Sequence, residues 1–354
     1  MKTVVLRTKT RSLAQIVRMA GKVLKKGGLV AFPTETVYGL GGNALSDESS
    51  KKIYAAKGRP SDNPLIVHVG NVKDVEKLVE SIPEKAVKLM EAFWPGPLTL
   101  IFPKSGLVPK ETTGGLDTVA IRMPSHPVAA ALLKSLPFPV AAPSANLSGR
   151  PSTTEAYHVI EDLSGRVDMI IDDGDVPIGV ESTILDLTGE VPTLLRPGFI
   201  TVEEMERVIG KIEVDPAIET RNLIEKSIDV RKPKAPGMKY RHYAPKAEMT
   251  IISGPEAYVA DYINANADDH TGILATEERK ELYRKGVVVT VGHRSDPNEI
   301  AHHLFEALRT FDELKVTRIY SEDLSDSDIG TAIMNRLLKA AGGNYKVIDK
   351  EDLS

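Results

Sequence analysis

Short apolar runs alternate with amphipathic helical segments along most of the chain, and this alternation limits the folds that are open to it. It predicts strands joined by helices, which is the α/β class. In the first half, the strands are predicted at residues 29–32, 65–69, 98–102, 119–123, 140–142, 169–171 and 184–187. The helices between them are predicted from Ser12 to the Gly27-Gly28 stop, from a cap at Asp47 to Ala56, and at 127–133, 154–163 and 202–209.

The alternation is interrupted between residues 213 and 247, where prolines and glycine stand among lysines and arginines. This composition is typical of an irregular linker. After it, strands are predicted at 249–252, 272–275, 287–291, 318–320 and 345–348, with a helix at 299–314. We therefore predict a catalytic domain at 1–212, a linker at 213–247 and a smaller Rossmann-like parallel-sheet domain at 248–354; a length of 354 residues fits two domains.

The overall charge and the absence of cysteine exclude several classes of function. A formal net charge of -4 argues against a protein that grips nucleic acid with its whole surface. The chain has no cysteine, which excludes disulfides, thiolate catalysis and cysteine-ligated metals. Neither a signal peptide nor a membrane span is recognisable, so a cytoplasmic location without membrane association is expected.

Polar side chains follow the first predicted strand, where open α/β sheets collect ligands. Thr34, Glu35 and Thr36 supply two hydroxyls and a carboxylate, and the glycine-rich 39–42 segment comes next. For these glycines a tight turn is the preferred interpretation, with contact to a ligand as the alternative. No Walker A sequence and no correctly spaced dinucleotide-binding glycine motif is present.

Four basic residues stand at predicted strand or helix ends, where they could neutralise a nucleotide triphosphate. They are Lys57, Arg59, Arg122 and Arg196. For the first two, pairing with a helix dipole is an equally good interpretation. Thr118 and Arg122 are an even number of residues apart on one strand and therefore share a face, so an anion between them is a further hypothesis.

Other candidate groups are weaker when each is taken alone. His68 lies within a predicted strand, where a lone histidine is usually structural. Ser144 lacks a nucleophile elbow and is interpreted as a binding residue, with a plain turn as the alternative. The acidic 172–175 segment has no calcium-loop pattern and is interpreted as a solvated turn. No metal ligands can be assigned, and Mg²⁺ is expected to arrive with ATP.

A series of motifs resembles one family in number and in order. The motifs are PTETVYGLG, KGRPSDNPLIVHV, FWPGPLT, TVAIRMPSHP, APSANLSG, GVESTILD and LLRPG, followed by PGMKYRHYAP in the linker. Together they resemble the long two-domain form of the YrdC-like threonylcarbamoyl-AMP synthases over nearly the whole chain. The resemblance implies a twisted, mixed α/β catalytic domain with a large cavity, rather than a purely parallel sheet.

The resemblance also implies an activity and its substrates. Family members combine L-threonine, bicarbonate or CO2, and ATP into threonylcarbamoyl-AMP and diphosphate, as nucleotidyltransferases. The product serves threonylcarbamoyladenosine formation beside the tRNA anticodon. A downstream threonylcarbamoyl-transfer complex and tRNA itself are the further partners that the resemblance suggests.

The family pattern assigns roles to residues of this sequence. It places Thr34, Thr36, His68, Arg122, Ala142 and Ser182 around L-threonine. It places Lys57, Arg59, Asn63, Thr118, Ser144, Asn146, Ser152 and Arg196 around ATP, with Tyr240 or Tyr243 of the linker closing over the nucleotide. Within this set, Lys57, Arg59, Ser144 and Asn146 are expected to be catalytic. The linker segment 236–245 is expected to act as a lid.

Two other functions stay open from the sequence alone. Carbamoyl-adenylate formation by a hydrogenase-maturation type of enzyme would use a related domain, although those enzymes resemble longer chains with cysteine-ligated zinc. A module that binds double-stranded RNA or tRNA is the second alternative. The oligomeric state, the role of the C-terminal domain and the general base cannot be predicted.

Overall fold

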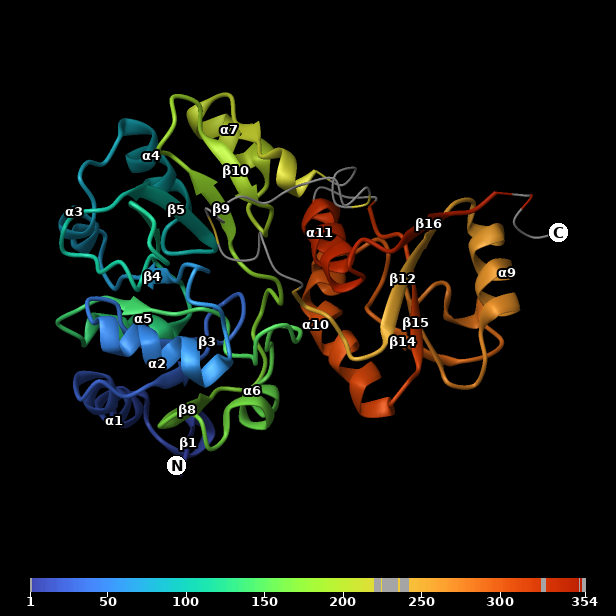
Figure 1. Ribbon diagram of the computed structural model, residues 1–354, viewed down its shortest axis with the longest axis horizontal. Helices are drawn as coiled ribbons and strands as arrows, with labels where there is room; N and C mark the ends of the chain where they lie inside the picture. The colour runs from blue at the N-terminus through green and yellow to red at the C-terminus, as the bar shows by residue number, and fades with distance from the viewer. Residues whose placement is uncertain are drawn as a thin grey trace. The chain divides into compact units, whose positions relative to one another are not determined.

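The computed structural model describes residues 2–219, 224, 235, 242–325, 329–349 and 351 of the chain (Figure 1). These residues form two compact units. The first unit is built mainly from residues 1–217 and the second mainly from residues 218–354. Gly149–Pro151 belongs to the second unit, and Ala235 belongs to the first.

The first unit is organised around a mixed β-sheet. Its strands are β1 Val4–Arg7, β2 Val30–Phe32, β3 Gly39–Asn43, β4 Ile66–His68, β5 Leu98–Pro103, β6 Thr118–Arg122, β7 Val140–Ala141, β8 Met169–Asp172, β9 Thr183–Asp186, β10 Thr193–Arg196 and β11 Glu213–Val214. Over the described residues their order is β1-β8-β2-β3-β7-β4-β6-β5-β9-β10-β11. β4 is parallel to β6, whereas β7 is antiparallel to β4 and β5 is antiparallel to β6. The predicted mixed α/β architecture is confirmed.

The helices of this unit begin at recognisable caps. They are α1 Leu13–Lys25, α2 Asp47–Lys57, α3 Val75–Leu78, α4 Glu84–Phe93, α5 Pro127–Lys134, α6 Ala156–Leu163 and α7 Val202–Ile209. Ser12 caps α1 and forms a capping box with Gln15, as its sequence predicts. The cap predicted for α2 was wrong by one position, because Ser46 accepts the N–H of Ser49 at 3.2 Å. Asp47 lies in the first turn, where its charge favours the helix dipole.

The glycine-rich segment is a strand, and its interpretation as a tight turn was wrong. β3 pairs with β2 in antiparallel fashion, with Ala31 opposite Leu40. A Cβ on Gly41 would come within 2.7 Å of the Phe32 and Val140 side chains. Only glycine therefore lets β3 lie this close to the core, and the chain turns earlier, in the segment between β2 and β3.

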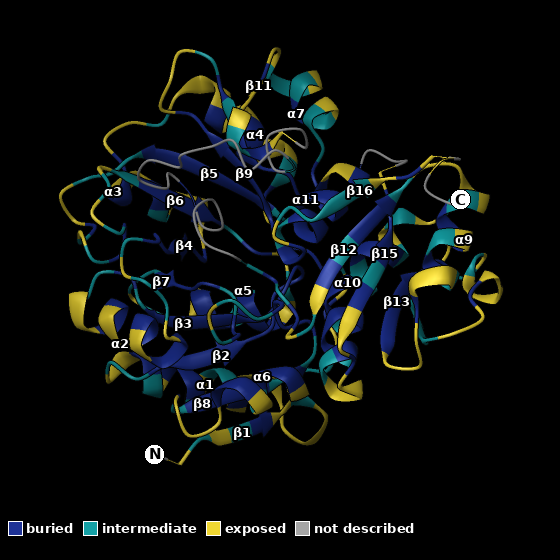
Figure 2. Ribbon diagram, turned by 45° about the vertical axis from the view of Figure 1, so that its right-hand side comes forward, coloured by how far each residue is buried: buried dark blue, intermediate teal, exposed yellow. Residues whose placement is uncertain are grey.

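One face of the sheet carries a large apolar cluster and the candidate site. α1 and α5 cover its β2 and β7 region, where Ile16, Phe32, Leu132 and Val140 are buried together (Figure 2). Val140 is in register with His68 on β4, so the same face continues across β4, β6, β5 and β9. There it carries a second apolar cluster that consists of Ile66, Ile101, Ala120, Ile184, Leu195 and Ala235.

The second unit has a parallel sheet. Its strands are β12 Glu248–Ser253, β13 Thr271–Ala275, β14 Val287–Thr290, β15 Arg318–Glu322 and β16 Tyr345–Val347. Its helices, within the described residues, are α9 Glu256–Asn266, α10 Pro297–Leu314 and α11 Gly330–Ala340. The described strands follow the order β14-β13-β15-β12-β16, and each neighbouring pair is parallel. The predicted second α/β sheet with parallel strands is confirmed.

Candidate active site

Arg122 is buried at the end of β6, where three neighbours hold its guanidinium. Nη1 donates to Thr36 Oγ1 at 2.8 Å, Nη2 lies 2.8 Å from Glu35 Oε1, and Nε donates to the carbonyl of Gly96 at 3.3 Å. Thr34 Oγ1 lies 3.0 Å from Thr36 Oγ1. The segment after β2 therefore fixes the cation in one orientation, as a site for a carboxylate requires.

The electrostatics of this cluster fix two protonation states. Burial raises the pKa of the Glu35 carboxyl, but the charge and hydrogen bond of Arg122, together with the backbone N–H groups of Glu35 and Ser125, lower it further and hold that pKa below its usual range. His68 is in register with Arg122, and its Nδ1 lies 3.1 Å from the carbonyl oxygen of Ile66. Burial, and next the positive charge of Arg122, lower the pKa of His68 to about 3. At neutral pH the carboxylate is ionised and the imidazole is neutral.

A row of polar groups extends from Arg122 across the neighbouring strands. Thr99 of β5 is in register with Arg122, and its Oγ1 lies 2.8 Å from Ser182 Oγ. Arg196 donates from Nη2 to the same Ser182 oxygen at 3.1 Å and from Nε to the Ser182 carbonyl at 3.0 Å. Sequence reasoning missed Thr99, although a polar residue within the apolar strand LTLIF is a usable signal.

Ser152 lies beside this row. Its hydroxyl donates to Glu181 Oε1 at 2.5 Å, and Glu181 directly precedes Ser182. The structure therefore brings Ser152 and Arg196, which the resemblance assigned to ATP, next to Ser182, which it assigned to threonine. Glu181 was given no role in the predicted site, although the motif GVESTILD contains it.

Lys57, Ser144 and Asn146 converge in a second group. Gly58 ends α2 in the left-handed conformation, with φ 63°. The buried Lys57 ammonium donates to the backbone carbonyls of Ser144, at 2.5 Å, and of Asn146. Ser144 Oγ donates to Asn146 Oδ1 at 2.5 Å. Three of the four residues expected to be catalytic are therefore in contact.

Arg59 and Asn63 follow α2 and lie near each other. The Arg59 guanidinium donates to the carbonyls of Asn63, at 3.3 Å, and of Pro64, at 3.1 Å. The Asn63 side chain is buried, and neither its nitrogen nor its oxygen has a hydrogen-bond partner within the described structure. A buried amide left unpaired is costly, so these atoms suit a polar ligand.

Thr118 lies at the opposite end of β6 from Arg122. A rise of four residue steps along the strand separates their Cα atoms by about 13 Å. The Arg122 guanidinium contacts Thr36 and Glu35, and the hypothesis of an anion between Arg122 and Thr118 stays a prediction. Thr118 lies at the edge where β4 and β6 begin, the edge that Asn63 approaches.

Of the remaining candidates, Ala142 and Tyr243 lie within the described residues and Tyr240 does not. Ala142 directly follows β7 and donates its N–H to the carbonyl of Ile66 at 2.9 Å, so it lies beside Ile66, two residues before His68 on β4. Tyr243 belongs to the second unit and packs on Phe305 with ring centroids 5.1 Å apart. Tyr240 and most of the expected 236–245 lid lie outside the described residues.

Comparisons with known proteins match both units. Residues 22–198 match the Sua5, YciO and YrdC family model, described as telomere recombination, and residues 200–342 match the C-terminal domain of threonylcarbamoyl-AMP synthase. The threonylcarbamoyl-AMP synthase of Pyrococcus abyssi is 46% identical, covering 98% of this chain and 99% of its own. The chain belongs to the threonylcarbamoyl-AMP synthase family.

A second relative and a solved structure support this membership. The family member from Bacillus subtilis is 49% identical and covers 92% of this chain and 93% of its own length. The crystal structure of P. abyssi Sua5 complexed with L-threonine superposes with a TM-score of 0.89 at 44% identity, covering 99% of this chain and 100% of that one. The resemblance found in the motifs is thus confirmed for the long two-domain form of the family.

Proposed function

We propose that the chain is an L-threonylcarbamoyladenylate synthase, a nucleotidyltransferase that converts L-threonine, bicarbonate or CO2, and ATP to threonylcarbamoyl-AMP and diphosphate. The product supplies threonylcarbamoyladenosine formation next to the anticodon of tRNAs. The observation that carries the proposal is the buried Arg122, oriented by Glu35 and Thr36 in a chain of this family. A crystallised relative at 44% identity was in complex with L-threonine.

In this proposal the threonine carboxylate binds at Arg122. The fixed Glu35 leaves the guanidinium preoriented, so little ordering is needed on binding. His68 faces the ligand as a neutral imidazole, which avoids a second cation beside Arg122. Thr34, Thr36, Ala142 and Ser182 complete the proposed threonine site.

ATP is proposed to bind across the remaining candidates. The set consists of Lys57, Arg59, Asn63, Thr118, Ser144, Asn146, Ser152 and Arg196, together with Tyr240 or Tyr243. The buried, unpaired Asn63 amide supports this assignment, because a nucleotide offers both donors and acceptors. The described residues contain no group of three or more His, Asp or Glu side chains suited to a metal, and Mg²⁺ is proposed to enter with the phosphates.

The proposed chemistry depends on positioning and on charge stabilisation. A carbamate oxygen formed on the threonine nitrogen attacks the α-phosphorus, and diphosphate leaves; Lys57, Arg59, Ser144 and Asn146 stabilise the developing charge. Water must be excluded from the labile mixed anhydride. The linker 213–247 is proposed to cover the site, and the packing of Ala235 against Ile66 and Ala120 supports this.

The proposal also includes the domain boundaries and the cellular context. The catalytic domain is proposed to span 1–212 and the C-terminal domain 248–354. None of the described helices is both long and apolar enough to span a membrane. A cytoplasmic location, tRNA and a downstream threonylcarbamoyl-transfer complex are proposed on the basis of the family.

The test is threonine-dependent product formation. Purified protein is incubated with labelled bicarbonate, ATP, Mg²⁺ and either threonine, serine or no amino acid, and threonylcarbamoyl-AMP and diphosphate are measured. We expect product with threonine alone, a loss of at least about a hundredfold in Arg122→Gln, and full activity in Arg207→Gln, a change of an exposed arginine on α7. ATP turnover that is indifferent to threonine contradicts the proposal.

The alternative functions receive no support from the comparisons. The close relatives that match over both units are named threonylcarbamoyl-AMP synthases, neither RNA-binding modules nor carbamoyl-adenylate-forming enzymes. The same assay separates these alternatives, since an RNA binder would show salt-dependent affinity without requiring ATP or threonine.

A further inference from the structure

The second unit has a cavity at the carboxyl ends of its parallel strands, where the order of the strands in the sheet reverses. β12 and β15 are neighbours in the sheet. The chain leaves β12 through α9 toward β13 on one side, and leaves β15 through α11 toward β16 on the other. The two connections thus run past one another in opposite directions, and right-handed connections of this kind lie on opposite faces of the sheet. In open α/β sheets, ligands bind in the crevice that such a reversal leaves at the carboxyl ends of the strands.

The cavity is small and polar. It encloses about 130 Å³ and is lined by Ile252, Ser253, Gly254, Val259, Arg279, Arg294, Asp323 and Ser325. Ordinary small-molecule sites measure roughly 300–1,000 Å³. The volume therefore suits a single head group rather than a whole nucleotide.

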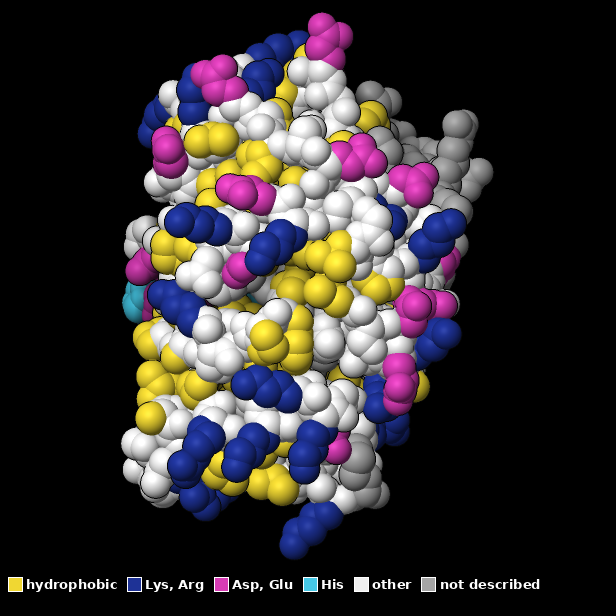
Figure 3. All heavy atoms as spheres, turned by 90° about the vertical axis from the view of Figure 1, so that its left-hand side faces the viewer, with side chains coloured by type: hydrophobic (Ala, Val, Ile, Leu, Met, Phe, Trp, Pro, Cys, Tyr) yellow, Lys and Arg dark blue, Asp and Glu magenta, His cyan; other side chains and the backbone are white. Residues whose placement is uncertain are grey.

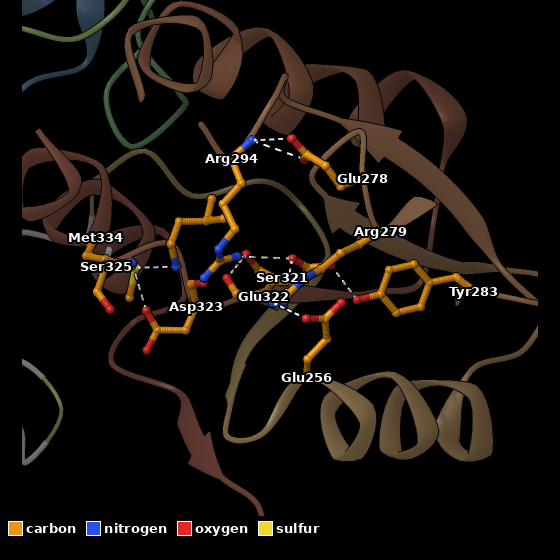
Figure 4. A network of polar contacts seen from close by, with 11 residues as sticks. Glu256, Glu278, Arg279, Tyr283, Arg294, Ser321, Glu322, Asp323, Ser325 and Met334 are labelled. Carbon is orange, nitrogen blue, oxygen red and sulfur yellow. Dashed lines mark hydrogen bonds and ion pairs between the residues drawn. The ribbon is translucent and has the colours of Figure 1, made fainter. Parts of the chain in front are cut away.

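Two arginines of the lining share one buried carboxylate. Arg279 Nη1 lies 3.3 Å and Arg294 Nη1 lies 3.6 Å from the same oxygen of Glu322, whose side chain is fully buried (Figure 4). Tyr283 donates its hydroxyl to the other Glu322 oxygen at 2.6 Å. Glu322 thus holds two guanidiniums beside each other at the wall of the cavity, a pairing that like charges would otherwise oppose.

Two other carboxylates near the cavity, those of Asp323 and Glu278, already accept hydrogen bonds. Asp323 accepts the N–H of Ser325 at 3.0 Å and the hydroxyl of Tyr345, so its carboxylate is directed toward these donors. The Glu278 carboxylate accepts the backbone N–H of Arg294. Of the four carboxylates near the two arginines, Glu256 and Glu278 belong to exposed residues, whereas Asp323 is partly buried and Glu322 is buried.

Glu256 is the remaining partner, and it differs from Glu322 in exposure. Its carboxylate lies 3.2 Å from Arg279 Nη2, yet 58% of its side chain is exposed. An exposed ion pair contributes little, so another anion can replace this one. A ligand that displaces Glu256 would leave the local charge balance unchanged.

We propose that this cavity binds a small anionic group, a phosphate or a carboxylate of a metabolite, at Arg279 and Arg294, and that Glu256 is the side chain it displaces. The ligand gains two charge-assisted partners that Glu322 has already oriented. The site lies within the second unit and does not depend on the activity proposed for the first.

The first test uses a variant that should bind more tightly. Binding of inorganic phosphate, and separately of acetate, to the full chain is measured by calorimetry at low ionic strength. Glu256→Gln removes the competing carboxylate, so we expect affinity for the bound anion to rise several-fold. Glu248→Gln, an equal charge change at the opposite end of β12, should leave it unchanged.

The second test removes a donor. Arg294→Gln should weaken binding of the same anion by about tenfold or more, because a hydrogen bond from a charged donor is lost. Arg318→Gln, an exposed arginine at the amino end of β15, is the matched control. Anion sites in the first unit would persist in every variant and are thereby separated from this one.

The outcomes are decisive even if Arg294→Gln fails to fold. Tighter binding in Glu256→Gln with no change in Glu248→Gln supports the site, and the anion that responds identifies the ligand group. Equal affinities in wild type, Glu256→Gln and Glu248→Gln, or no binding of either anion, would overturn the proposal.

Discussion

The two units each bury a carboxylate against arginine, but they do so in different ways. In the first unit Glu35 has one cation partner in the described structure, Arg122 at 2.8 Å. In the second, Glu322 contacts Arg279 and Arg294 and also accepts the Tyr283 hydroxyl. Burial opposes ionisation of both carboxyls, yet the pKa of Glu35 is lowered and that of Glu322 is raised.

The difference shows that the number of partners does not decide the direction of a pKa shift. For Glu322, burial raises the pKa more than its three donors lower it; the arginine distances of 3.3 and 3.6 Å are longer than the single 2.8 Å contact of Glu35. The close pair of Glu35 and Arg122 keeps the carboxyl ionised, but the loss of either residue leaves the other buried without a partner of opposite charge. A shared carboxylate tolerates the loss of one contact and leaves its arginines adjacent.

The largest effect is expected from breaking the single pair. Arg122→Gln leaves Glu35 buried without its cation, so the free energy of unfolding of the first unit should fall by about 3–5 kcal/mol. Trp94, the one tryptophan of the chain, lies buried in this unit and reports on it by fluorescence during urea unfolding.

A double variant distinguishes charge from packing as the cause. Glu35→Gln combined with Arg122→Gln removes both charges and should recover part of the lost stability. If the double variant is no more stable than Arg122→Gln alone, the unpaired carboxylate is not the cause of the loss.

A smaller effect is expected in the shared network. Tyr283→Phe removes one of three donors to Glu322, and both arginines remain, so the second unit should lose about 2 kcal/mol. The loss should be seen in circular dichroism as an earlier transition that Trp94 fluorescence does not follow. A loss as large as that of Arg122→Gln would mean that the shared network is no more tolerant than the single pair.

The fold was predictable where periodicity and capping act locally. Apolar runs located β4 to β9 and β12 to β16 to within one or two residues, and Ser12 marked the start of α1. β11 was missed as well, since Glu213–Val214 pairs with β10 at the start of the segment that we predicted as an irregular linker. β1 and β3 were missed for different reasons. β1 has one buried residue among four. β3 needs glycine because the Phe32 and Val140 side chains pack against it, and both residues lie outside the glycine-rich segment.

The candidate site was predictable from motifs more than from residue chemistry. Thr36 and Arg122 are 86 positions apart, yet they form a hydrogen bond. Spacing along one strand suggested a link between Thr118 and Arg122, but the strand itself holds them apart. The partners of Arg122 follow from the sheet order, in which strands distant in sequence become neighbours, and no local pattern encodes that order.

The smallest effect, when it is counted per pH unit, concerns the pH dependence beside the single pair. His68 has a folded pKa of about 3, well below that of an unfolded histidine. Between those two values the unfolded chain holds the extra proton, so stability should fall as pH falls below about 6.5, by up to about 1.4 kcal/mol per pH unit. His68→Gln cannot take up this proton and should show a flatter dependence in Trp94-monitored unfolding at about pH 7, 6 and 5. Equal slopes in the two proteins would mean that His68 takes up its proton in the folded state as readily as in the unfolded chain. The first network would then tolerate a change of charge as the second is expected to do.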